Sequence, residues 1–201
     1  MIIVDVETTG LNPKRHSIVS IGAIDFSNPE NQFYQECRIW DGAEISKEAL
    51  EINGFSEKEI KNLNKRSLEE IIKDFLKWVS KINERTLAGE NPAFDLNFLK
   101  ASCERYNITW SLGYRTIDLH SLCYIHYLRR GLIPPEKDKK SNLNLDTILK
   151  YVGLPAEPKP HNALTGAKME AEAFSRLVYG KNLLNEFNNY PIPHFLYQNF
   201  R

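Results

Sequence analysis

Two acidic side chains near the N-terminus, Asp5 and Glu7, lie two residues apart at the end of the apolar run MIIVDV. Residues two apart on a β-strand share one face of the pleat. Two carboxylates that point from a buried strand toward one place repel each other, and a divalent cation is the usual way to make that arrangement favourable. A solvated pair of acids at a strand end is the simpler interpretation, so a metal site needs support from elsewhere in the chain.

Two further segments place polar side chains at the starts of helices. The sequence predicts a short strand at residues 86–89 and a helix over residues 93–106, which puts Asp95 in the first turn, where the helix dipole favours a carboxylate. His161 opens the stretch HNALTGAKMEAEAF, which predicts the last long helix of the chain. Taken alone, Asp95 is more simply a helix N-terminal acid, and His161 a structural or surface histidine.

The three segments together resemble a known family. DVETTG at residues 5–10, NPAFD at 91–95 and HNAL at 161–164 resemble, in order and spacing, the three motifs of the DEDDh (DnaQ-like) 3′ to 5′ exonucleases, which have a ribonuclease H-like fold. The resemblance spans about residues 1–178 and implies a two-metal nuclease. By this resemblance Asp5 and Glu7 bind both ions, and Asp95 binds directly or through water. An all-oxygen ligand set favours Mg²⁺ or Mn²⁺.

The same resemblance implies the remaining roles. His161 is expected to act as general base toward the attacking water, since an imidazole titrates near neutral pH. The expected reaction removes nucleoside 5′-monophosphates from the 3′ ends of single-stranded DNA or RNA. Apolar and aromatic contacts to unstacked bases tolerate any sequence, so we expect little base specificity. The residues expected to contact the substrate are Thr8, Thr9, Leu11, Asn91 and Phe94.

The chain departs from the family pattern at Gly166, where the third motif normally carries an aspartate. In one interpretation Glu170, one turn later on the same helical face, reaches back toward the N-terminus and supplies the fourth metal-binding carboxylate. In a second, the site works with three acids and an additional water. In a third, the chain is a catalytically impaired module that binds nucleic-acid 3′ ends or a polymerase. Glu172 points elsewhere on the helix and is expected to be a solvated or capping acid.

The rest of the chain must supply the elements that position these residues. Apolar runs at residues 1–6, 18–26 and 33–40 predict three strands that begin the chain in antiparallel order. The expected fold class is α/β, with a ribonuclease H-like mixed five-stranded sheet flanked by helices. Residues 133–142 are expected to form a solvated loop. The remaining predicted elements are helices at 46–60 (broken near Gly54), 67–82, from about 119 to 131 and from about 142 to 152, and a strand at 115–119.

Composition sets wider limits on the function. The chain has 26 basic and 26 acidic residues, which neither supports nor excludes a polyanionic partner. The absence of a long apolar run predicts a cytoplasmic protein without a membrane partner, and Cys37, Cys103 and Cys123 are expected to be buried, reduced thiols. We expect an exonuclease domain at residues 1–180 and a tail at 181–201 that packs on the domain or on a partner. A homodimer or a polymerase partner is compatible with the pattern.

Overall fold

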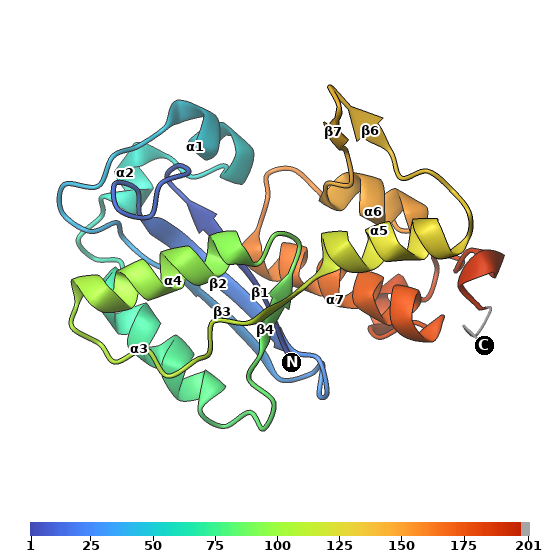
Figure 1. Ribbon diagram of the computed structural model, residues 1–201. Helices are drawn as coiled ribbons and strands as arrows, with labels where there is room; N and C mark the ends of the chain where they lie inside the picture. The colour runs from blue at the N-terminus through green and yellow to red at the C-terminus, as the bar shows by residue number, and fades with distance from the viewer. Residues whose placement is uncertain (198–201) are drawn as a thin grey trace.

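The computed structural model describes residues 1–197 and contains a mixed five-stranded sheet in the order β3-β2-β1-β4-β5 (Figure 1). β1 pairs antiparallel with β2, and β2 pairs antiparallel with β3, whereas β4 and β5 continue the sheet in parallel. This arrangement confirms the predicted fold class. The strands are β1 (Ile2–Thr8), β2 (Ile18–Asp25), β3 (Gln32–Glu36), β4 (Leu87–Gly89) and β5 (Thr116–Asp118).

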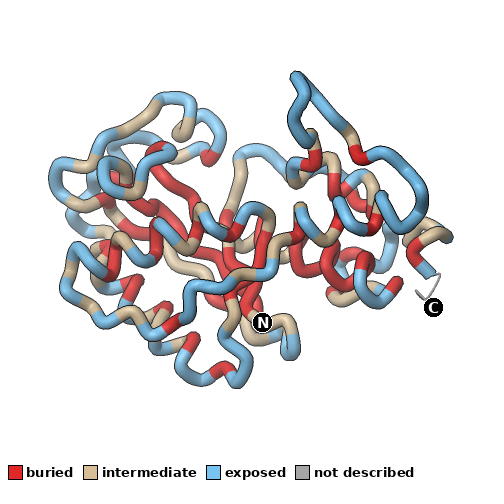
Figure 2. Tube along the Cα trace, viewed as in Figure 1, coloured by how far each residue is buried: buried red, intermediate tan, exposed pale blue. Residues whose placement is uncertain are grey.

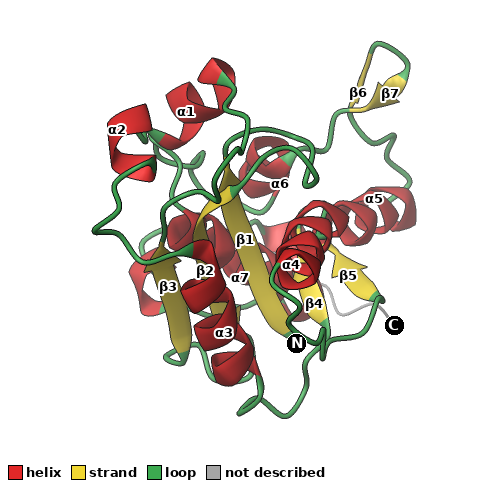
Figure 3. Ribbon diagram, turned by 90° about the vertical axis from the view of Figure 1, so that its left-hand side faces the viewer, coloured by secondary structure: helices red, strands yellow, loops and turns green. Residues whose placement is uncertain are grey.

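Helices cover both faces of the sheet (Figure 3). One face packs against α3 (Leu68–Val79) and α4 (Ala93–Arg105), and the other against α5 (Leu119–Arg129), α6 (Leu145–Tyr151) and α7 (Ala163–Tyr179). The predicted loop at 133–142 contains a small hairpin of two exposed strands. The remaining elements are α1 (Lys47–Asn53), α2 (Glu57–Ile60), β6 (Glu136–Lys137), β7 (Lys140–Ser141), and the 3₁₀ turns η1 (Asn185–Phe187) and η2 (His194–Leu196).

The alternation along β1 decides which way its acids face. Ile2, Val4 and Val6 are buried in the core that contains α3 and α4, whereas Ile3 belongs to the core that contains α7. Figure 2 shows this central strand as largely buried, and Asp5 is its one partly exposed residue. Because side chains alternate between the faces of a strand, the odd-numbered Asp5 and Glu7 point to the same side as Ile3, toward α7.

A close approach between α7 and the sheet fixes the start of that helix. A Cβ atom at Gly22 of β2 would lie only 2.1 Å from the carbonyl carbon of Ala163, in the first turn of α7. Only glycine permits this contact between the two backbones. The segment that leads into α7, including His161, is therefore held close to the sheet.

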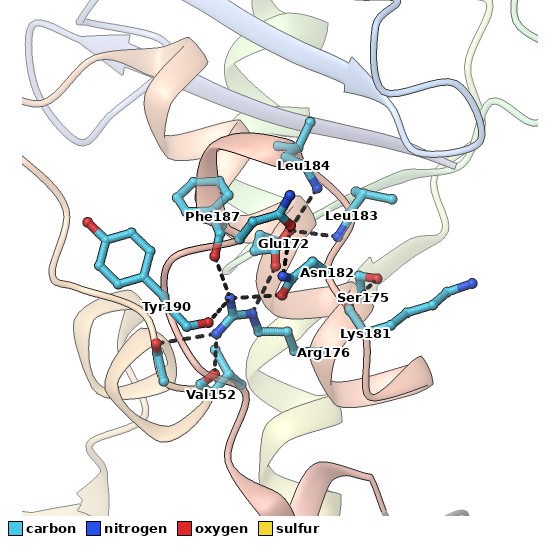
Figure 4. Close-up of polar contacts among 12 residues, drawn as sticks. Val152, Glu172, Ser175, Arg176, Lys181, Asn182, Leu183, Leu184, Phe187 and Tyr190 are labelled. Atoms are coloured by element: carbon cyan, nitrogen blue, oxygen red, sulfur yellow. Dashed lines mark hydrogen bonds and ion pairs between the residues drawn. The ribbon is translucent and has the colours of Figure 1, made fainter.

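Glu172 of α7 is fully buried, so the expectation that it is a solvated or capping acid is wrong. Its carboxylate pairs with Arg176 at 2.8 Å and accepts hydrogen bonds from the backbone N–H groups of Leu183 and Leu184 (Figure 4). The Arg176 guanidinium also donates to the carbonyl oxygens of Val152, Phe187 and Tyr190. Both charges are satisfied by hydrogen bonds, which makes their burial tolerable.

These contacts tie residues 182–190 to α7. Leu184, Phe187 and Leu196 add their side chains to the core on that face. The division of the chain at residue 180 stays a prediction, and residues 198–201 of the predicted tail lie outside the described residues. Cys37, Cys103 and Cys123 are buried free thiols, as expected. Within residues 1–197, every helix is too short or too polar to span a membrane.

We predict that Arg176→Met lowers the free energy of unfolding by about 3–5 kcal/mol, because it leaves the Glu172 carboxylate buried without its partner. Urea denaturation measures the change. Lys73→Met is the matched control, since Lys73 forms an exposed pair with Glu69 in α3 that contributes at most about 1 kcal/mol. Equal effects of the two substitutions would show that the buried pair does not stabilise the fold.

Candidate active site

A cleft of about 230 Å³ lies where the ends of β1 and β4 meet α4, α7 and the loop before α7. It brings together the four acids predicted to bind metal and the histidine predicted to act as base. It also contains two acids that were not predicted. The lining residues are Asp5, Glu7, Glu90, Asn91, Phe94, Asp95, Leu145, Glu157, His161 and Glu170.

Asp95 is held over β1 by a backbone hydrogen bond. β4 pairs with β1 only as far as Ala88, opposite Ile3, so the later residues of β1 have no strand partner on that side. There the backbone N–H of Val6 donates to Oδ1 of Asp95 at 3.0 Å. Asp95 is buried in the first turn of α4. Its carboxylate accepts the hydrogen bond of a β1 backbone N–H group that has no strand partner, and this contact brings it close to the acids of β1.

Two interactions with backbone groups hold the segment that carries His161 in place. Its backbone N–H donates to the carbonyl oxygen of Ile52 in α1 at 2.9 Å. The next residue, Asn162, caps α7 by accepting from the N–H groups of Leu164 and Thr165. Burial lowers the pKa of the His161 imidazole, which favours the neutral form that can accept a proton.

Gly166 provides clearance for Asp5. A Cβ atom at this position would lie 2.1 Å from Oδ2 of Asp5 and 3.4 Å from Oε1 of Glu157. The space beside the backbone of Gly166 is therefore occupied by these two carboxylates. An aspartate at position 166 would require the Asp5 side chain to move aside.

Glu170 faces the cleft one turn further along α7. It is buried, and its Oε2 atom has no hydrogen-bond partner. Oε2 lies beside Gly89 of β4, where a Cβ atom would be 2.9 Å away. The helix thus presents the carboxylate to the cleft, whereas the atoms nearest to Gly166 are those of Asp5 and Glu157 rather than those of Glu170.

Burial and mutual repulsion dominate the electrostatics of the cleft. Burial, followed by the nearby carboxylates, raises the pKa of Asp5 and of Glu170 well above the ordinary values. Burial also raises the pKa of Glu7 and of Glu157 to about 7. Oε1 of Glu157 and Oε2 of Glu170 are buried without a partner, and the acids offer only oxygen ligands, so the residues present fit a hard divalent cation such as Mg²⁺ or Mn²⁺.

The residues predicted to contact the substrate divide between two clefts. A neighbouring cleft of about 590 Å³ contains Thr8 and Leu11 and shares Phe94 and Glu7 with the first, while Asn91 lines the first. The structure does not bring Thr9 to either lining. Its side chain is buried, and its hydroxyl donates to the carbonyl oxygen of Glu44 at 2.6 Å. Thr9 lies just beyond the end of β1, where the pairing register with β2 has shifted between Glu7 and Thr8, so the alternation of the strand no longer sets its direction.

Sequence reasoning missed Glu90 and Glu157 as members of the cleft. Glu90 directly follows β4 and precedes the NPAFD motif, so its place at a strand end is a signal that could have identified it. Glu157 lies in a proline-rich segment without periodicity, four residues before His161. Only its proximity in sequence to the motif histidine pointed to it.

Comparison with known proteins found a matching family model and several relatives. A family model described as "Exonuclease" matches residues 2–174. DNA polymerase III subunit epsilon from Rickettsia typhi is 30% identical over 202 residues, which cover 94% of this chain and 81% of the relative. A DNA polymerase III PolC-type from Thermotoga maritima is 28% identical over 178 residues, and the match covers 88% of this chain but only 12% of that relative.

A solved structure shows the same fold. It is the nuclease domain of 3′hExo, described as a DEDDh family member bound to rAMP. Its TM-score to this chain is 0.68 at 17% sequence identity, and the match covers 92% of this chain and 94% of that one.

The raised pKa values predict how the metal-free protein responds to pH. Glu7 and Glu157 titrate at about 7 in the fold and near 4.5 ordinarily, so their contribution to stability is complete below about 4.5 and is lost as the pH rises through about 7. We expect the melting temperature in EDTA to fall by several degrees between about pH 5 and pH 8, since roughly 1 kcal/mol corresponds to 2–4 °C for a chain of this length.

Scanning calorimetry checks this expectation, with Glu7→Gln as the comparison that flattens the slope. Mn²⁺ should raise the melting temperature more at the higher pH, because ligand carboxylates must be deprotonated. A melting temperature that rises steadily over the same pH range in EDTA would contradict the electrostatics described for the cleft.

Proposed function

The chain belongs to the exonuclease family, and on this premise we propose that it is a metal-dependent 3′ to 5′ exonuclease that acts on single-stranded DNA or RNA. The family match confirms the predicted DEDDh-type family and the predicted enzyme class. One observation carries the proposal furthest. The carboxylates of Asp5, Glu7 and Asp95 line the same small cleft as the imidazole of His161.

In this proposal Asp5, Glu7, Asp95 and Glu170 hold two Mg²⁺ or Mn²⁺ ions. When bound, such a pair of ions stabilises the attacking and leaving oxygens of an in-line phosphoryl displacement. The role of Glu170 is supported by its burial and by the unpartnered oxygen that it presents to the cleft. In this proposal it adds a carboxylate to the cleft from one turn beyond Gly166, beside Gly89.

His161 serves as the general base. Burial lowers the pKa of the imidazole and so favours the neutral form, which can take a proton from the attacking water. The backbone hydrogen bond to Ile52 and the Asn162 cap hold it at the mouth of the cleft. Attack at the last phosphodiester then releases a nucleoside 5′-monophosphate.

The neighbouring cleft is the proposed site for the terminal nucleotides. Leu11 is 84% exposed at its edge, and Phe94 lies between it and the acidic cleft. An exposed apolar side chain and an aromatic ring suit contact with unstacked bases of any type. In this proposal the 3′ end lies here with its last phosphodiester toward the acids.

The partners and location of the protein are further proposals. The relatives from Rickettsia typhi and Thermotoga maritima carry the names of polymerase III components, which supports a polymerase partner, and a homodimer remains the other proposal. A cytoplasmic location stays a prediction. The glycine at position 166 favours a second candidate function, a catalytically impaired module that binds 3′ ends without cleaving them.

We predict that the protein shortens a 5′-labelled single-stranded oligonucleotide stepwise from its 3′ end in the presence of Mg²⁺ or Mn²⁺. Deoxyribose and ribose versions of the oligonucleotide are tested in parallel. Asp5→Ala should reduce the rate by more than about 100-fold, since even the loss of an outer partner of a metal ligand costs 10–100-fold. Asp41→Ala, which removes an exposed acid outside the cleft, is the matched control and should cleave normally.

Two outcomes would decide against parts of this proposal. If the wild-type protein binds the oligonucleotide tightly but does not shorten it with any divalent metal, the result would support the second candidate function, a catalytically impaired module. If the Glu170→Gln variant cleaves at the wild-type rate, Glu170 is not a metal ligand, and a site with fewer acids is favoured.

A further inference from the structure

Glu157 is an acid that the motifs do not assign, and the loop before α7 presses its side chain into the acidic cleft. The side chain is only 6% exposed, although the segment around it is largely on the surface. Its backbone N–H donates to Oδ1 of Asp146 in α6 at 3.2 Å, which ties the loop down at this residue. The carboxylate is therefore directed inward by the fold of the loop.

The two carboxylate oxygens have different surroundings. Oε2 lies 3.4 Å from Nδ1 of His161. Oε1 is buried and has no hydrogen-bond partner. No lysine or arginine within residues 1–197 forms an ion pair with Glu157. A buried carboxylate oxygen without a donor is costly, and a cation is the partner that would offset the cost.

The absence of a side chain at Gly166 leaves room for Oε1 of Glu157. Oε1 of Glu157 lies 3.4 Å from the position that a Cβ atom at residue 166 would occupy, next to Oδ2 of Asp5. A side chain at 166 would fill this space. Ligand atoms of Glu7, Glu157 and His161 also lie within 4.8 Å of one another, a grouping that can hold a metal ion.

We propose that Glu157 is a ligand of a divalent metal ion in the cleft, with its carboxylate in the space that the missing acid at position 166 leaves open. The loop thus supplies from outside α7 the negative charge that the first turns of the helix lack. Glu170 enters the cleft separately, beside Gly89. This inference rests on the proposed metal-dependent function and extends its set of ligands.

Mn²⁺ binding to the intact protein in the absence of nucleic acid tests the inference, measured by calorimetric titration and by electron paramagnetic resonance of free Mn²⁺. Glu157→Gln keeps the shape of the side chain and removes its charge. We expect it to weaken at least one Mn²⁺ site by about tenfold or more, as the loss of even an outer partner does. Glu136→Gln, which neutralises an exposed acid of β6, is the matched control and should bind like wild type.

A second substitution makes the test specific to the space at Gly166. Adding Gly166→Asp to Glu157→Gln returns a carboxylate to that place and should restore most of the lost affinity, with Asp5 rotating aside to admit it. Adding Gly166→Asp to Glu7→Gln should not. Glu157→Asp, which keeps the charge on a shorter side chain, should show an intermediate affinity.

Glu157→Gln that binds Mn²⁺ like wild type overturns the inference, whether or not its melting temperature in EDTA falls. A wild-type protein that binds no Mn²⁺ overturns both this inference and the proposed metal-dependent function. A wild-type protein that binds Mn²⁺ through Glu157 but does not shorten oligonucleotides supports the ligand and contradicts the exonuclease proposal. The two failures are therefore distinguishable.

Discussion

Repulsion between carboxylates that are removed from water is the constraint around which this molecule is built. Asp5 lies among acids from several elements, and burial together with these neighbours raises its pKa. Asp95 comes from α4, Glu170 from α7 and Glu157 from the loop before it. Such a group is unfavourable when all its members are ionised, so the rest of the fold must hold the acids in place against their mutual repulsion.

The two hydrophobic cores and several close backbone contacts supply the stability that holds the acids in place. Each face of the sheet is covered by helices whose apolar side chains pack on β1, so the strand that carries the acids is fixed from both sides. Gly22 admits α7 against β2, Gly166 makes room for Asp5, and Gly89 makes room for Glu170. The buried pair of Glu172 and Arg176 anchors the far part of α7 to the segment that follows it. The helix is therefore positioned at both ends.

The sequence predicted the parts of the site that follow from local patterns. Alternation along an apolar strand put Asp5 and Glu7 on one face, and the start of α4 put Asp95 beside them. Helical spacing placed Glu170 toward the cleft. Thr9 was grouped with Thr8 by the motif, but it follows the last residue of β1 after a register shift between Glu7 and Thr8, and its side chain points into the protein interior. Simple alternation would have kept Thr9 on the side of Asp5 and Glu7, so the end of the strand could not be predicted from that rule.

Tertiary partners decided the rest. Nothing in the periodicity of a proline-rich loop indicates that Glu157 turns inward, because its direction depends on how the loop packs against α6. A glutamate such as Glu172 within a helix is usually exposed to solvent. Here its burial depends on the backbone N–H groups of residues 183 and 184, which donate hydrogen bonds to its carboxylate. Its spacing of four from Arg176 was visible, although this spacing is equally common on exposed helix faces.

The presence of a metal centre in the acidic cleft can be tested most directly by anomalous diffraction from crystals of the protein soaked in Mn²⁺, recorded at the manganese absorption edge. We expect anomalous peaks in contact with the carboxylates of Asp5 and Glu7, with Asp95 nearby. If well-diffracting crystals at saturating Mn²⁺ show no anomalous peak in this cleft, the result would contradict a metal centre at this site. Peaks elsewhere in the crystal would not change that conclusion.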